Sequence, residues 1–500
     1  MINQHKRIYL DELLTHIGVM TGSHDLHVEV SGVHMDSRKI QPGNCFVAIQ
    51  GYKENGLKYI GDAIAKGAGS VVFEANPEDT FPVIPRGIPW ARIDNARLAL
   101  SRMAAEFYGR PADALYNIGI TGTNGKTTVM SLIHAILNRS ALTAKIGTLG
   151  MSCDALSGKT GLTTPESLDI FQFLAEAREQ GCQNLVMEVS SVSLKLCRVA
   201  DIPFSQAIFT SFSGDHLDFH HTMDDYLQSK LMLFKNMGAP HWAIVNIDDQ
   251  AADTVLKHSE CRCLTYGFSE QADVRPLEYT FSLDGIRAVL QTPRGPIAIQ
   301  SRMVGRVNLS NLMAAVASAV VKGIDTETIV QAIGEFLPVR GRLDVTVKDD
   351  FFVLIDYAHT DNALELLLQS LREIAPRRII LVFGAGGSRD TTKRPRMGRV
   401  ASRHADVVVV TSDNPRAEEP LDIIQAIIAG FEPGFNRYRI ETDRRQAIEA
   451  ALRMAQKGDL VVIAGKGHED YQIFKDQTIH FDDYEVVRDV MHILKQEPHA

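Results

Sequence analysis

A short glycine-rich segment between an apolar run and a helical run is the feature that most restricts the fold. Residues 116–120 (Tyr-Asn-Ile-Gly-Ile) have the length of a strand and include two β-branched residues, Thr121-Gly122-Thr123-Asn124-Gly125-Lys126-Thr127-Thr128 follows, and helical periodicity continues to residue 139. Glycines let backbone N–H groups approach phosphate oxygens, and the N-terminus of the following helix adds a favourable dipole. This order predicts a parallel α/β sheet that binds a nucleoside triphosphate.

Two side chains of this loop carry the expected chemistry. Lys126 would reach the β- and γ-phosphates, and Thr127 would present its hydroxyl to Mg²⁺. Ile120 stands where the general phosphate-loop pattern has glycine, and Gly119 comes one position early. A glycine-rich turn without a ligand is the alternative, but the adjacent lysine and threonine favour phosphate binding.

Chain length and two predicted linkers indicate three domains. A chain of 500 residues is too long for one compact core at roughly 150 residues per domain. A helical stretch over 96–108 ends at Gly109-Arg110-Pro111, and a second linker is expected over 336–342. We therefore predict an N-terminal domain over residues 1–108, a central domain over 109–338 and a C-terminal domain over 339–500.

Apolar runs of strand length alternate with helical stretches in the last two of these domains. This alternation predicts α/β domains with doubly wound, mostly parallel sheets. Ligands bind at the carboxyl edge of such sheets, where polar or glycine-rich residues follow the strands. The runs after the first are 184–187, 207–210 and 242–246, then 352–355, 378–383, 407–411 and 460–464.

Composition argues against several classes of protein. There are 52 Lys and Arg against 61 Asp and Glu, a net charge of −9, which disfavours a general binder of nucleic acid or anionic lipid. No apolar run approaches the ~20 residues of a membrane span, and residues 1–7 lack the apolar stretch of a secretory signal. The six cysteines suggest no disulfide framework. We expect a cytoplasmic, monomeric protein with small-molecule substrates.

Charged residues at the ends of later strands are candidates for a metal site. Glu188 directly follows the run 184–187, and a carboxylate across from a phosphate loop is a natural Mg²⁺ ligand; the alternative is an isolated solvent-facing glutamate. Asp215-His216-Leu217-Asp218-Phe219-His220 indicates a metal or phosphate site, unless Asp215 or Asp218 caps a helix. Lys230 lies in an amphipathic stretch, and periodicity alone predicts that it faces solvent.

These motifs in this order resemble those of the Mur ligase family of ATP-dependent amide-forming enzymes. The resemblance covers nearly the whole chain and implies a UDP-substrate-binding N-terminal domain, a central P-loop-type ATP-binding domain and a Rossmann-like C-terminal domain for an amino acid. Besides the phosphate loop and Asp215-His216-Leu217-Asp218, it rests on Asp36-Ser37-Arg38-Lys39-Ile40-Gln41-Pro42-Gly43, Asp356-Tyr357-Ala358-His359-Thr360, Lys393-Arg394-Pro395, Asp413-Asn414-Pro415-Arg416 and Gly465-Lys466-Gly467-His468-Glu469.

The resemblance also implies roles for individual residues. The expected ATP contacts are Gly122, Thr123, Asn124, Gly125, Lys126, Thr127, Thr128, Asn308, Arg342 and Asp356. The expected contacts to the UDP-linked acceptor are Ser37, Arg38, Thr163, Thr164, Ser190 and Arg198. The expected amino-acid pocket comprises Arg389, Asp413, Asn414, Arg416, Gly465 and Glu469.

The family chemistry further implies catalytic roles for Lys126, His216, Lys230 and His359, and two Mg²⁺ ions. The implied metal ligands are Thr127, Glu188, His216 and Lys230, the lysine as a carbamate formed with CO₂. This overturns the solvent-facing interpretation of Lys230. Carbamylation converts a cation into an anion that can hold Mg²⁺.

The Asp-Asn-Pro-Arg form of the pocket resembles family members that add meso-diaminopimelate. Arg416 can bind the distal carboxylate of that amino acid bidentately, and Glu469 can take its distal ammonium. L-Lysine has no distal carboxylate and would leave Arg416 unpaired. The expected activity is therefore ATP-dependent addition of meso-2,6-diaminopimelate to UDP-N-acetylmuramoyl-L-alanyl-D-glutamate through an acyl phosphate, in peptidoglycan precursor synthesis.

Several positions depart from the family pattern and keep alternatives open. A ligase of this fold could use L-lysine or another amino acid, or an acceptor from a specialised metabolite pathway. A non-catalytic ATP-binding partner is a second alternative. A folate-type polyglutamate ligase shares the central chemistry, but the N-terminal domain and Arg416 argue against it. The departures are Val192, Ser211, Gly214, His221 and Asp361.

Overall fold

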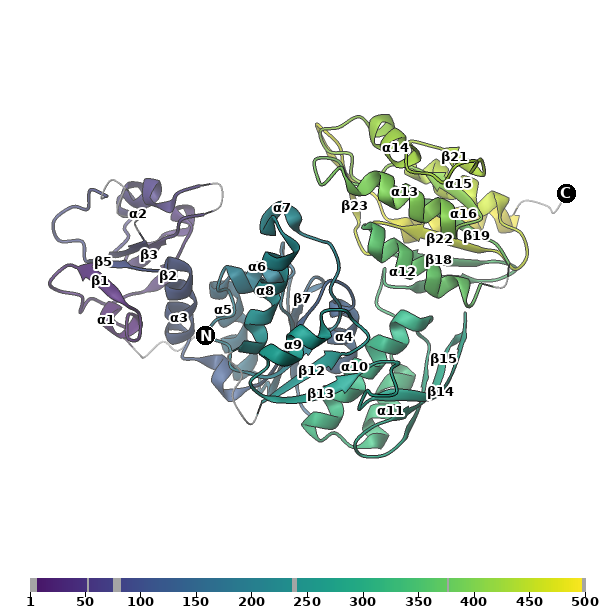
Figure 1. Cartoon of the computed structure of the whole chain (residues 1–500). Helices are drawn as coiled ribbons and strands as arrows, with labels where there is room; N and C mark the ends of the chain where they lie inside the picture. The colour runs from purple at the N-terminus through teal and green to yellow at the C-terminus, as the bar shows by residue number, and fades with distance from the viewer. Residues whose placement is uncertain (1–6, 52–53, 75–81, 236–240, 376, 497–500) are drawn as a thin grey trace.

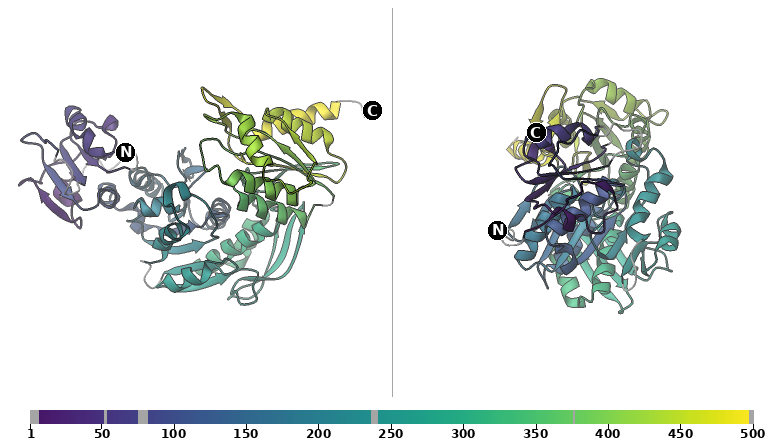
Figure 2. Two further views of the ribbon diagram at one scale, coloured as in Figure 1. Left: turned by 45° about the horizontal axis from the view of Figure 1, so that its top comes forward. Right: turned by 90° about the vertical axis from the view of Figure 1, so that its left-hand side faces the viewer.

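Helix-flanked sheets follow one another along the molecule (Figure 1). The computed structural model describes residues 7–51, 54–74, 82–235, 241–375 and 377–496. The sheet of the N-terminal residues and the sheet of the C-terminal residues lie at opposite ends, with the largest sheet between them (Figures 1 and 2). None of the described helices has the length and apolar character needed to cross a lipid bilayer.

The N-terminal sheet has the order β1-β5-β4-β3-β2, and β1 runs antiparallel to β5 while the other pairs are parallel. Its strands are β1 (Val19–Gly22), β2 (Gly32–His34), β3 (Asn44–Ala48), β4 (Ser70–Glu74) and β5 (Trp90–Ile93). The helices of this region are α1 (Leu10–Leu13), α2 (Ile60–Ala65) and α3 (Ala96–Phe107). The predicted helix over 96–108 is therefore confirmed.

The central sheet has the order β13-β12-β11-β6-β10-β7-β8-β9 and is parallel as far as β7, after which β8 and β9 run antiparallel. The strands are β6 (Tyr116–Thr121), β7 (Thr143–Gly147), β8 (Gly150–Cys153), β9 (Leu156–Gly158), β10 (Asn184–Glu188), β11 (Phe204–Phe209), β12 (Trp242–Asn246) and β13 (Arg262–Tyr266). Around them lie α4 (Lys126–Leu137), α5 (Ser167–Glu179), α6 (Ser191–Lys195), α7 (Leu217–His220), α8 (Met223–Lys235), α9 (Ala252–His258), α10 (Arg306–Lys322) and α11 (Thr326–Glu335).

Alternate residues of β10 show why this sheet is covered on both faces. Leu185 and Met187 belong to a buried cluster with residues of α5, α8 and α9, whereas Val186 packs in a cluster with α4, α10 and α11. A strand buried on both faces must be apolar throughout, which explains the continuous runs in the sequence. The predicted doubly wound, mostly parallel sheet is confirmed, and Glu188 is the last residue of β10 rather than the residue after it.

A further antiparallel sheet follows β13 in the sequence and precedes α10. It consists of β14 (Arg275–Ser282), β15 (Gly285–Gln291) and β16 (Ile297–Ser301). The sequence analysis did not predict this sheet. One of its faces packs on the helical layer through Ile286, Leu290 and Ile299.

The C-terminal sheet has the order β17-β18-β22-β19-β20-β21 and is parallel except for β17. Leu354 packs toward one helical layer and Val353 and Ile355 toward the other, as in a Rossmann-like fold. The strands are β17 (Asp344–Lys348), β18 (Phe352–Asp356), β19 (Ile379–Phe383), β20 (Val407–Val410), β21 (Tyr438–Ile440) and β22 (Leu460–Ala464), with a hairpin of β23 (Tyr471–Ile473) and β24 (Thr478–His480). The helices are α12 (Asp361–Arg372), α13 (Lys393–His404), α14 (Pro420–Ile428), α15 (Arg444–Met454) and α16 (Asp483–Gln496).

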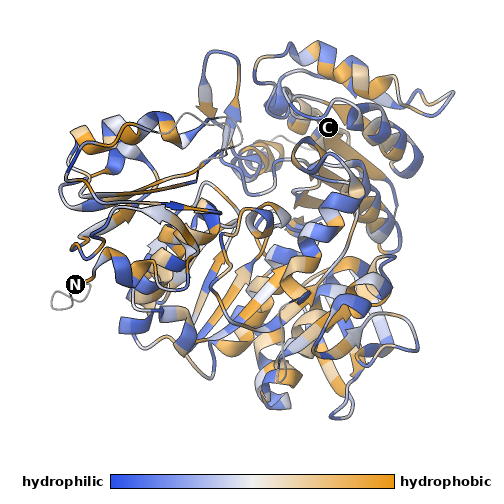
Figure 3. Ribbon diagram, turned by 60° about the vertical axis from the view of Figure 1, so that its left-hand side comes forward, coloured by the Kyte–Doolittle hydropathy of each residue, from blue (hydrophilic) through white to orange (hydrophobic). Residues whose placement is uncertain are grey.

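The hydropathy pattern follows these layers. Hydrophobic residues predominate along the strands and the helix faces turned toward them, and hydrophilic residues lie on the outer helix faces and loops (Figure 3). The predicted domain boundaries fall between α3 and β6 and between α11 and β17, and they remain predictions. The carboxyl edges of β6, β10 and β18 carry the candidate site.

The linker between α11 and β17 is held against the C-terminal sheet. Gly341 has a φ of +72°, and a Cβ at this position would lie 2.4 Å from the carbonyl carbon of Gly467 and from the nitrogen of His468. Its N–H donates to the Tyr484 hydroxyl at 2.5 Å. The linker therefore touches the loop that follows β22 backbone to backbone.

We predict that Gly341→Ala destabilises the protein more than the matched control Gly434→Ala. Gly434 has a φ of +83° with no atom near its Cβ position, so its replacement costs only the backbone strain of about 1 kcal/mol. Gly341→Ala should cost about 1–3 kcal/mol more because the methyl group overpacks the linker. Chemical denaturation measures both, and equal losses would contradict the close fit at Gly341.

Candidate active site

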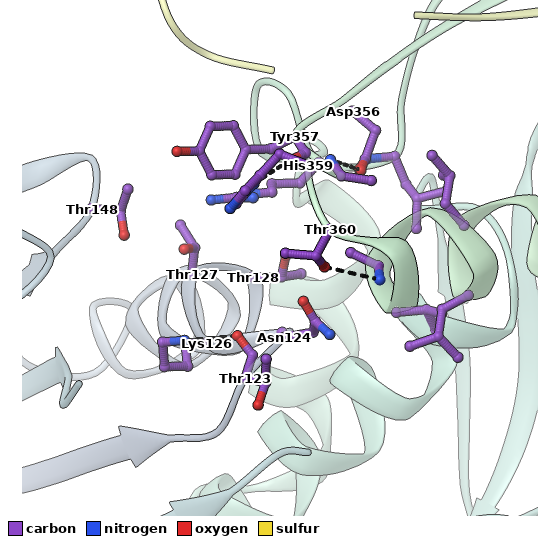
Figure 4. A pocket seen from close by; sticks show the side chains of 18 of the residues that line it. Thr123, Asn124, Lys126, Thr127, Thr128, Thr148, Asp356, Tyr357, His359 and Thr360 are labelled. Carbon is purple, nitrogen blue, oxygen red and sulfur yellow. Dashed lines mark hydrogen bonds between the residues drawn. The ribbon is translucent and has the colours of Figure 1, made fainter. Parts of the chain in front are cut away.

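A cavity of about 250 Å³ lies between the phosphate loop and the segment after β18. In Figure 4, Thr127 and Thr128 at the start of α4 lie across this space from His359 and Thr360. The cavity brings together the predicted residues Thr123, Asn124, Gly125, Lys126, Thr127, Thr128, Thr163, Glu188, His216, Asn308, Arg342, Asp356 and His359. Residues from the central and C-terminal sheets therefore share one site.

Two glycines of the loop occupy positions that no other residue fits. Gly122 has a φ of +144°, and a Cβ there would lie 1.9 Å from Oγ1 of Thr210. Gly125 is the N-cap residue of α4 with a φ of +87°, and its Cβ would lie 2.6 Å from Oδ1 of Asn311. The loop therefore passes close to β11 and α10, with the start of α4 directed into the cavity.

Two lysines bind the same carbonyl of this loop. Nζ of Lys126 donates to the carbonyls of Gly122 and Thr123, each at 2.9 Å, and Nζ of Lys230 donates to Gly122 at 2.9 Å. Lys230 is 2% exposed, and its Nζ lies 4.3 Å from the ring centroid of Tyr226. The interpretation of Lys230 as a solvent-facing residue, drawn from periodicity alone, is wrong.

The electrostatic setting lowers the pKa of both amines. Burial lowers the pKa of Lys230 well below its usual value, and the nearby charge of Lys126 lowers it further. Burial also lowers the pKa of Lys126, although the carboxylates of Glu188 and Asp215 act in the opposite direction. Lys230 therefore has an increased share of the neutral amine, which is the form that reacts with CO₂.

Glu188 is a buried carboxylate rather than a solvent-facing one. It is 1% exposed, and its two oxygens accept from the hydroxyl of Thr127 at 3.0 Å and from the N–H of Thr148 at 2.9 Å. The hydroxyl of Thr148 lies 3.3 Å from the same carboxylate. Glu188 thus joins the end of β10 to the first turn of α4.

These oxygens suit Mg²⁺, which binds one or two protein groups and completes its shell with phosphate oxygens and water. Thr127 and Glu188 supply a hydroxyl and a carboxylate at the phosphate end of the cavity. Within the part of the chain that the structure describes, no three His, Cys, Asp or Glu side chains converge closely enough to hold a metal ion alone.

The segment before α7 places an acid and a histidine at the rim. His216 is the N-cap residue of α7 in a left-handed conformation, and its side chain makes no capping hydrogen bond. Asp215 accepts from the N–H of His216 at 2.8 Å instead of capping the helix. Both side chains line the cavity, so the capping alternative for Asp215 is wrong.

The opposite wall of the cavity is built by the segment after β18. Asp356 accepts from the N–H groups of Leu343 and Ala358 at 2.7 Å each, and burial raises the pKa of its carboxyl group. The Arg342 guanidinium stacks 4.4 Å from the ring centroid of Tyr357. Nδ1 of His359 lies 2.9 Å from the carbonyl oxygen of Tyr357 and donates a hydrogen bond to it.

A larger cavity of about 770 Å³ adjoins the first, and the two share Asp215, His216, Tyr357, His359 and Thr360. All of the predicted amino-acid-binding residues line it: Arg389, Asp413, Asn414, Arg416, Gly465 and Glu469. Its volume exceeds that of the first cavity, so it has room for an amino acid together with the end of a second substrate. The shared wall is where two bound molecules would meet.

A hydrogen-bond network fixes the charged groups of this larger cavity. Glu469 accepts from Nδ2 of Asn414 at 3.0 Å and from Nζ of the fully buried Lys466 at 3.1 Å. Arg416 lies in a left-handed conformation and donates from Nη1 to the carbonyl of Gly387 at 2.9 Å. These contacts hold Arg416 and Glu469 in place while the rest of each side chain faces the cavity.

The predicted acceptor contacts divide into two groups. Thr164 donates to the carbonyl of Glu188 at 2.9 Å and lies 3.3 Å from Ser190, and Arg198 donates to the carbonyl of Thr164 at 3.0 Å. This group borders the first cavity through Thr163. Ser37 and Arg38, near the N-terminal sheet, line neither cavity.

Sequence reasoning missed several residues of this region, including Thr148, Asn311, Tyr357 and Lys466. Thr148, Asn311 and Tyr357 line the cavities, and Lys466 lies buried beneath the larger one. Tyr357 and Lys466 belong to motifs that the sequence analysis quoted without assigning them a role. Asn311 follows Asn308 by three residues on α10 and donates to it, a spacing that could have identified it.

Comparison with known proteins gives matches along most of the chain. Models described as the Mur ligase family catalytic domain, the Mur ligase middle domain and the Mur ligase glutamate ligase domain match residues 29–108, 120–319 and 341–467. A UDP-N-acetylmuramoyl-L-alanyl-D-glutamate–2,6-diaminopimelate ligase of Syntrophomonas wolfei is 41% identical, over 96% of this chain and 99% of the relative. The ligase of that name from Gloeobacter violaceus is 42% identical, over 96% and 98%.

The solved structures include a similar protein. The structure of a UDP-N-acetylmuramoyl-L-alanyl-D-glutamate–2,6-diaminopimelate ligase superposes with a TM-score of 0.69 at 30% sequence identity. The match covers 98% of this chain and 100% of the other. The predicted fold class is therefore confirmed.

We predict that Thr127→Val weakens the Mg²⁺-dependent part of nucleotide binding. The substitution keeps the shape of the side chain but removes the hydroxyl that orients Glu188, and loss of such a group typically costs about 10–100-fold in metal affinity. Calorimetry with ADP and Mg²⁺ should show at least about a tenfold loss. With EDTA in place of Mg²⁺, ADP should bind both proteins equally, and an equal loss in both arms would contradict the role of Thr127.

Proposed function

The chain belongs to the Mur ligase family, and we propose that it joins meso-2,6-diaminopimelate to UDP-N-acetylmuramoyl-L-alanyl-D-glutamate in an ATP-dependent reaction. This would make it an amide ligase of peptidoglycan precursor synthesis, required for cell-wall growth and division. The proposal rests mainly on one observation: the cavity lined by the phosphate loop adjoins the cavity lined by Arg416 and Glu469.

The choice of amino acid rests on the paired charges of the larger cavity. A guanidinium and a carboxylate in one pocket complement an ammonium–carboxylate centre, which diaminopimelate carries at both ends. Asn414 and Lys466 already hold Glu469, and Gly387 holds Arg416. Substrate binding therefore costs these two side chains little conformational entropy. An amino acid without the distal carboxylate would leave Arg416 desolvated and unpaired.

The proposed reaction has two chemical stages. The terminal carboxylate of the acceptor attacks the γ-phosphorus of ATP, the bond to the bridging oxygen breaks, and ADP leaves with that electron pair. The amine of diaminopimelate then attacks the carbonyl carbon of the acyl phosphate, and the tetrahedral intermediate expels inorganic phosphate while the nitrogen loses a proton. Activation is needed because phosphate is a much better leaving group than oxide.

The residues of this chain contribute position and charge to those stages. Lys126 would leave the carbonyls of Gly122 and Thr123 for the β- and γ-phosphates. His216 and His359 stand on the wall that both cavities share, where the acyl phosphate and the amine would meet. Asp356 would contact the ribose. Such positioning accounts for much of the catalysis of phosphoryl transfer.

Two Mg²⁺ ions, when bound, would neutralise charge on the phosphates and on the acyl group. We propose Thr127, Glu188, His216 and a carbamate on Lys230 as the protein ligands. The oxygens of Thr127 and Glu188 meet the preference of Mg²⁺ for hard ligands. Burial of Lys230 and its lowered pKa support carbamylation, because CO₂ adds only to a neutral amine.

The acceptor would lie along the group of Thr164, Ser190 and Arg198, with its UDP moiety toward Ser37 and Arg38. Buried Arg198 pairs with Glu166 at 2.6 Å, which leaves part of its guanidinium for a substrate carboxylate. We also propose that the protein acts as a monomer in the cytoplasm. One chain supplies both cavities, and the six cysteines, all within the described residues, are free thiols as in a reducing compartment.

We predict that phosphate release from ATP, Mg²⁺ and the UDP-muramoyl-dipeptide requires diaminopimelate and is not supported by L-lysine. Arg416→Met should lower kcat/KM for diaminopimelate by about 100-fold, because the distal carboxylate loses its partner. Arg403→Met, on the exposed face of α13, is the matched control and should behave like the wild type. Equal turnover with lysine would reassign the amino acid, and nucleotide binding without any amide product would favour a non-catalytic partner.

We predict that Lys230→Ala abolishes turnover, while Lys230→Glu, or added bicarbonate with the alanine form, restores part of it. Lys322→Ala is the matched control because Lys322 also lies over a tyrosine ring, at 3.6 Å from the centroid of Tyr116, but far from both cavities along α10. NMR with ¹³C-bicarbonate should show a carbamate signal that Lys230→Ala lacks. An unchanged rate in Lys230→Ala would refute the role.

A further inference from the structure

A fully buried ion pair lies beneath the amino-acid pocket. The side chains of Arg444 and Asp483 are both 0% exposed. Nε and Nη2 of Arg444 donate to the two carboxylate oxygens of Asp483 at 2.8 Å each. Arg444 is the first residue of α15 and Asp483 the first residue of α16, so the pair joins the starts of two helices at the carboxyl edge of the sheet.

The same guanidinium also binds two backbone carbonyls from different strands. Nη1 donates to the carbonyl of Ser412 at 3.3 Å, and Nη2 donates to the carbonyl of Ala464 at 3.2 Å. Ser412 lies two residues beyond β20, and Ala464 is the last residue of β22. Since β19 separates these strands in the sheet, Arg444 spans an intervening strand to link their ends.

Each of these carbonyls leads directly into a loop of the pocket. Asp413, Asn414 and Arg416 follow Ser412, while Gly465 and Glu469 follow Ala464. We propose that Arg444 is a positioning residue that fixes the spacing of the two loops, and thus of Arg416 and Glu469, for the distal ammonium–carboxylate centre of the amino-acid substrate. This inference rests on the proposed function.

The chemistry of arginine explains why this residue type suits the position. A planar guanidinium donates in several fixed directions at once, whereas the single ammonium of lysine is a compact charge on a flexible stem. Burial by itself lowers the pKa of Arg444, but the charges of Asp483, Asp413 and Glu469 more than offset it and raise the pKa. The protonated guanidinium thus keeps all of its donors, and two of its electrostatic partners belong to the pocket itself.

The opposite edge of the same sheet offers a matched control. Arg378 and Asp459 also form a bidentate pair, with Nε and Nη2 of Arg378 at 3.1 and 2.5 Å from the carboxylate oxygens. Arg378 precedes β19 and Asp459 precedes β22, so this pair lies at the amino edge, away from the pocket. The two pairs have the same chemistry but only the first touches pocket loops.

The test compares Arg444→Lys with Arg378→Lys in the full chain. For Arg444→Lys we expect the KM for diaminopimelate to rise at least about tenfold, while the KM values for ATP and for the UDP-linked acceptor stay within about twofold. Hydrogen exchange should become faster in residues 412–416 and 465–469 together. Arg378→Lys should change none of the three KM values, even if it lowers the melting temperature.

A second variant covers the case in which the single substitution prevents folding. Arg444→Met with Asp483→Leu removes both charges and leaves no buried carboxylate unpaired, a replacement that folded proteins often tolerate. It should show the same selective rise in KM. An unchanged KM for diaminopimelate, or an equal deterioration for all three substrates, overturns the inference. If the wild type itself shows no turnover that depends on diaminopimelate, the proposed function fails. Hydrogen exchange in residues 412–416 and 465–469 then still tests whether Arg444 fixes the two loops.

Discussion

The carbonyl of Gly122 accepts hydrogen bonds from two lysines, and the arrangement of the nucleotide site depends on this contact. Burial lowers the pKa of each amine, and the nearby charge of Lys126 lowers the pKa of Lys230 further. The arrangement is therefore costly unless anions enter the cavity or one amine loses its charge. A bound triphosphate would meet the first condition and the proposed carbamate on Lys230 would meet the second, so the same crowding would favour both.

Sequence reasoning was strongest where backbone geometry dictates residue type. Strands buried on both faces are mostly apolar, so β6, β10, β12 and β19 were identified with small errors at their ends. The antiparallel sheet β14–β16 was missed because its strands alternate exposed and buried residues and lack the continuous apolar run of the parallel strands, although Asp284-Gly285 and Gly295-Pro296 mark its turns. The loop glycines could be identified because Gly122 and Gly125 leave no room for a Cβ.

Sequence reasoning was weakest where function depends on distant partners. The periodicity of α8 placed Lys230 on the solvent side, since a helical pattern does not show that the phosphate loop packs over that face. The resemblance to the family corrected this. Arg444 and Asp483 gave no local signal, because neither lies in a motif. Asp483 and Ser412, two partners of Arg444, are 39 and 32 residues away from it in the sequence.

The shared wall of the two cavities explains why the chain needs two sheets. Asp215 and His216 come from the central sheet, and Tyr357, His359 and Thr360 come from the C-terminal one. An acyl phosphate made on one side must meet an amine held on the other before water reaches it. Because the linker packs at Gly341 on the loop that follows β22, Arg342 of the smaller cavity and Glu469 of the larger one belong to one body. Any movement of that body relative to the phosphate loop therefore opens or closes both cavities together.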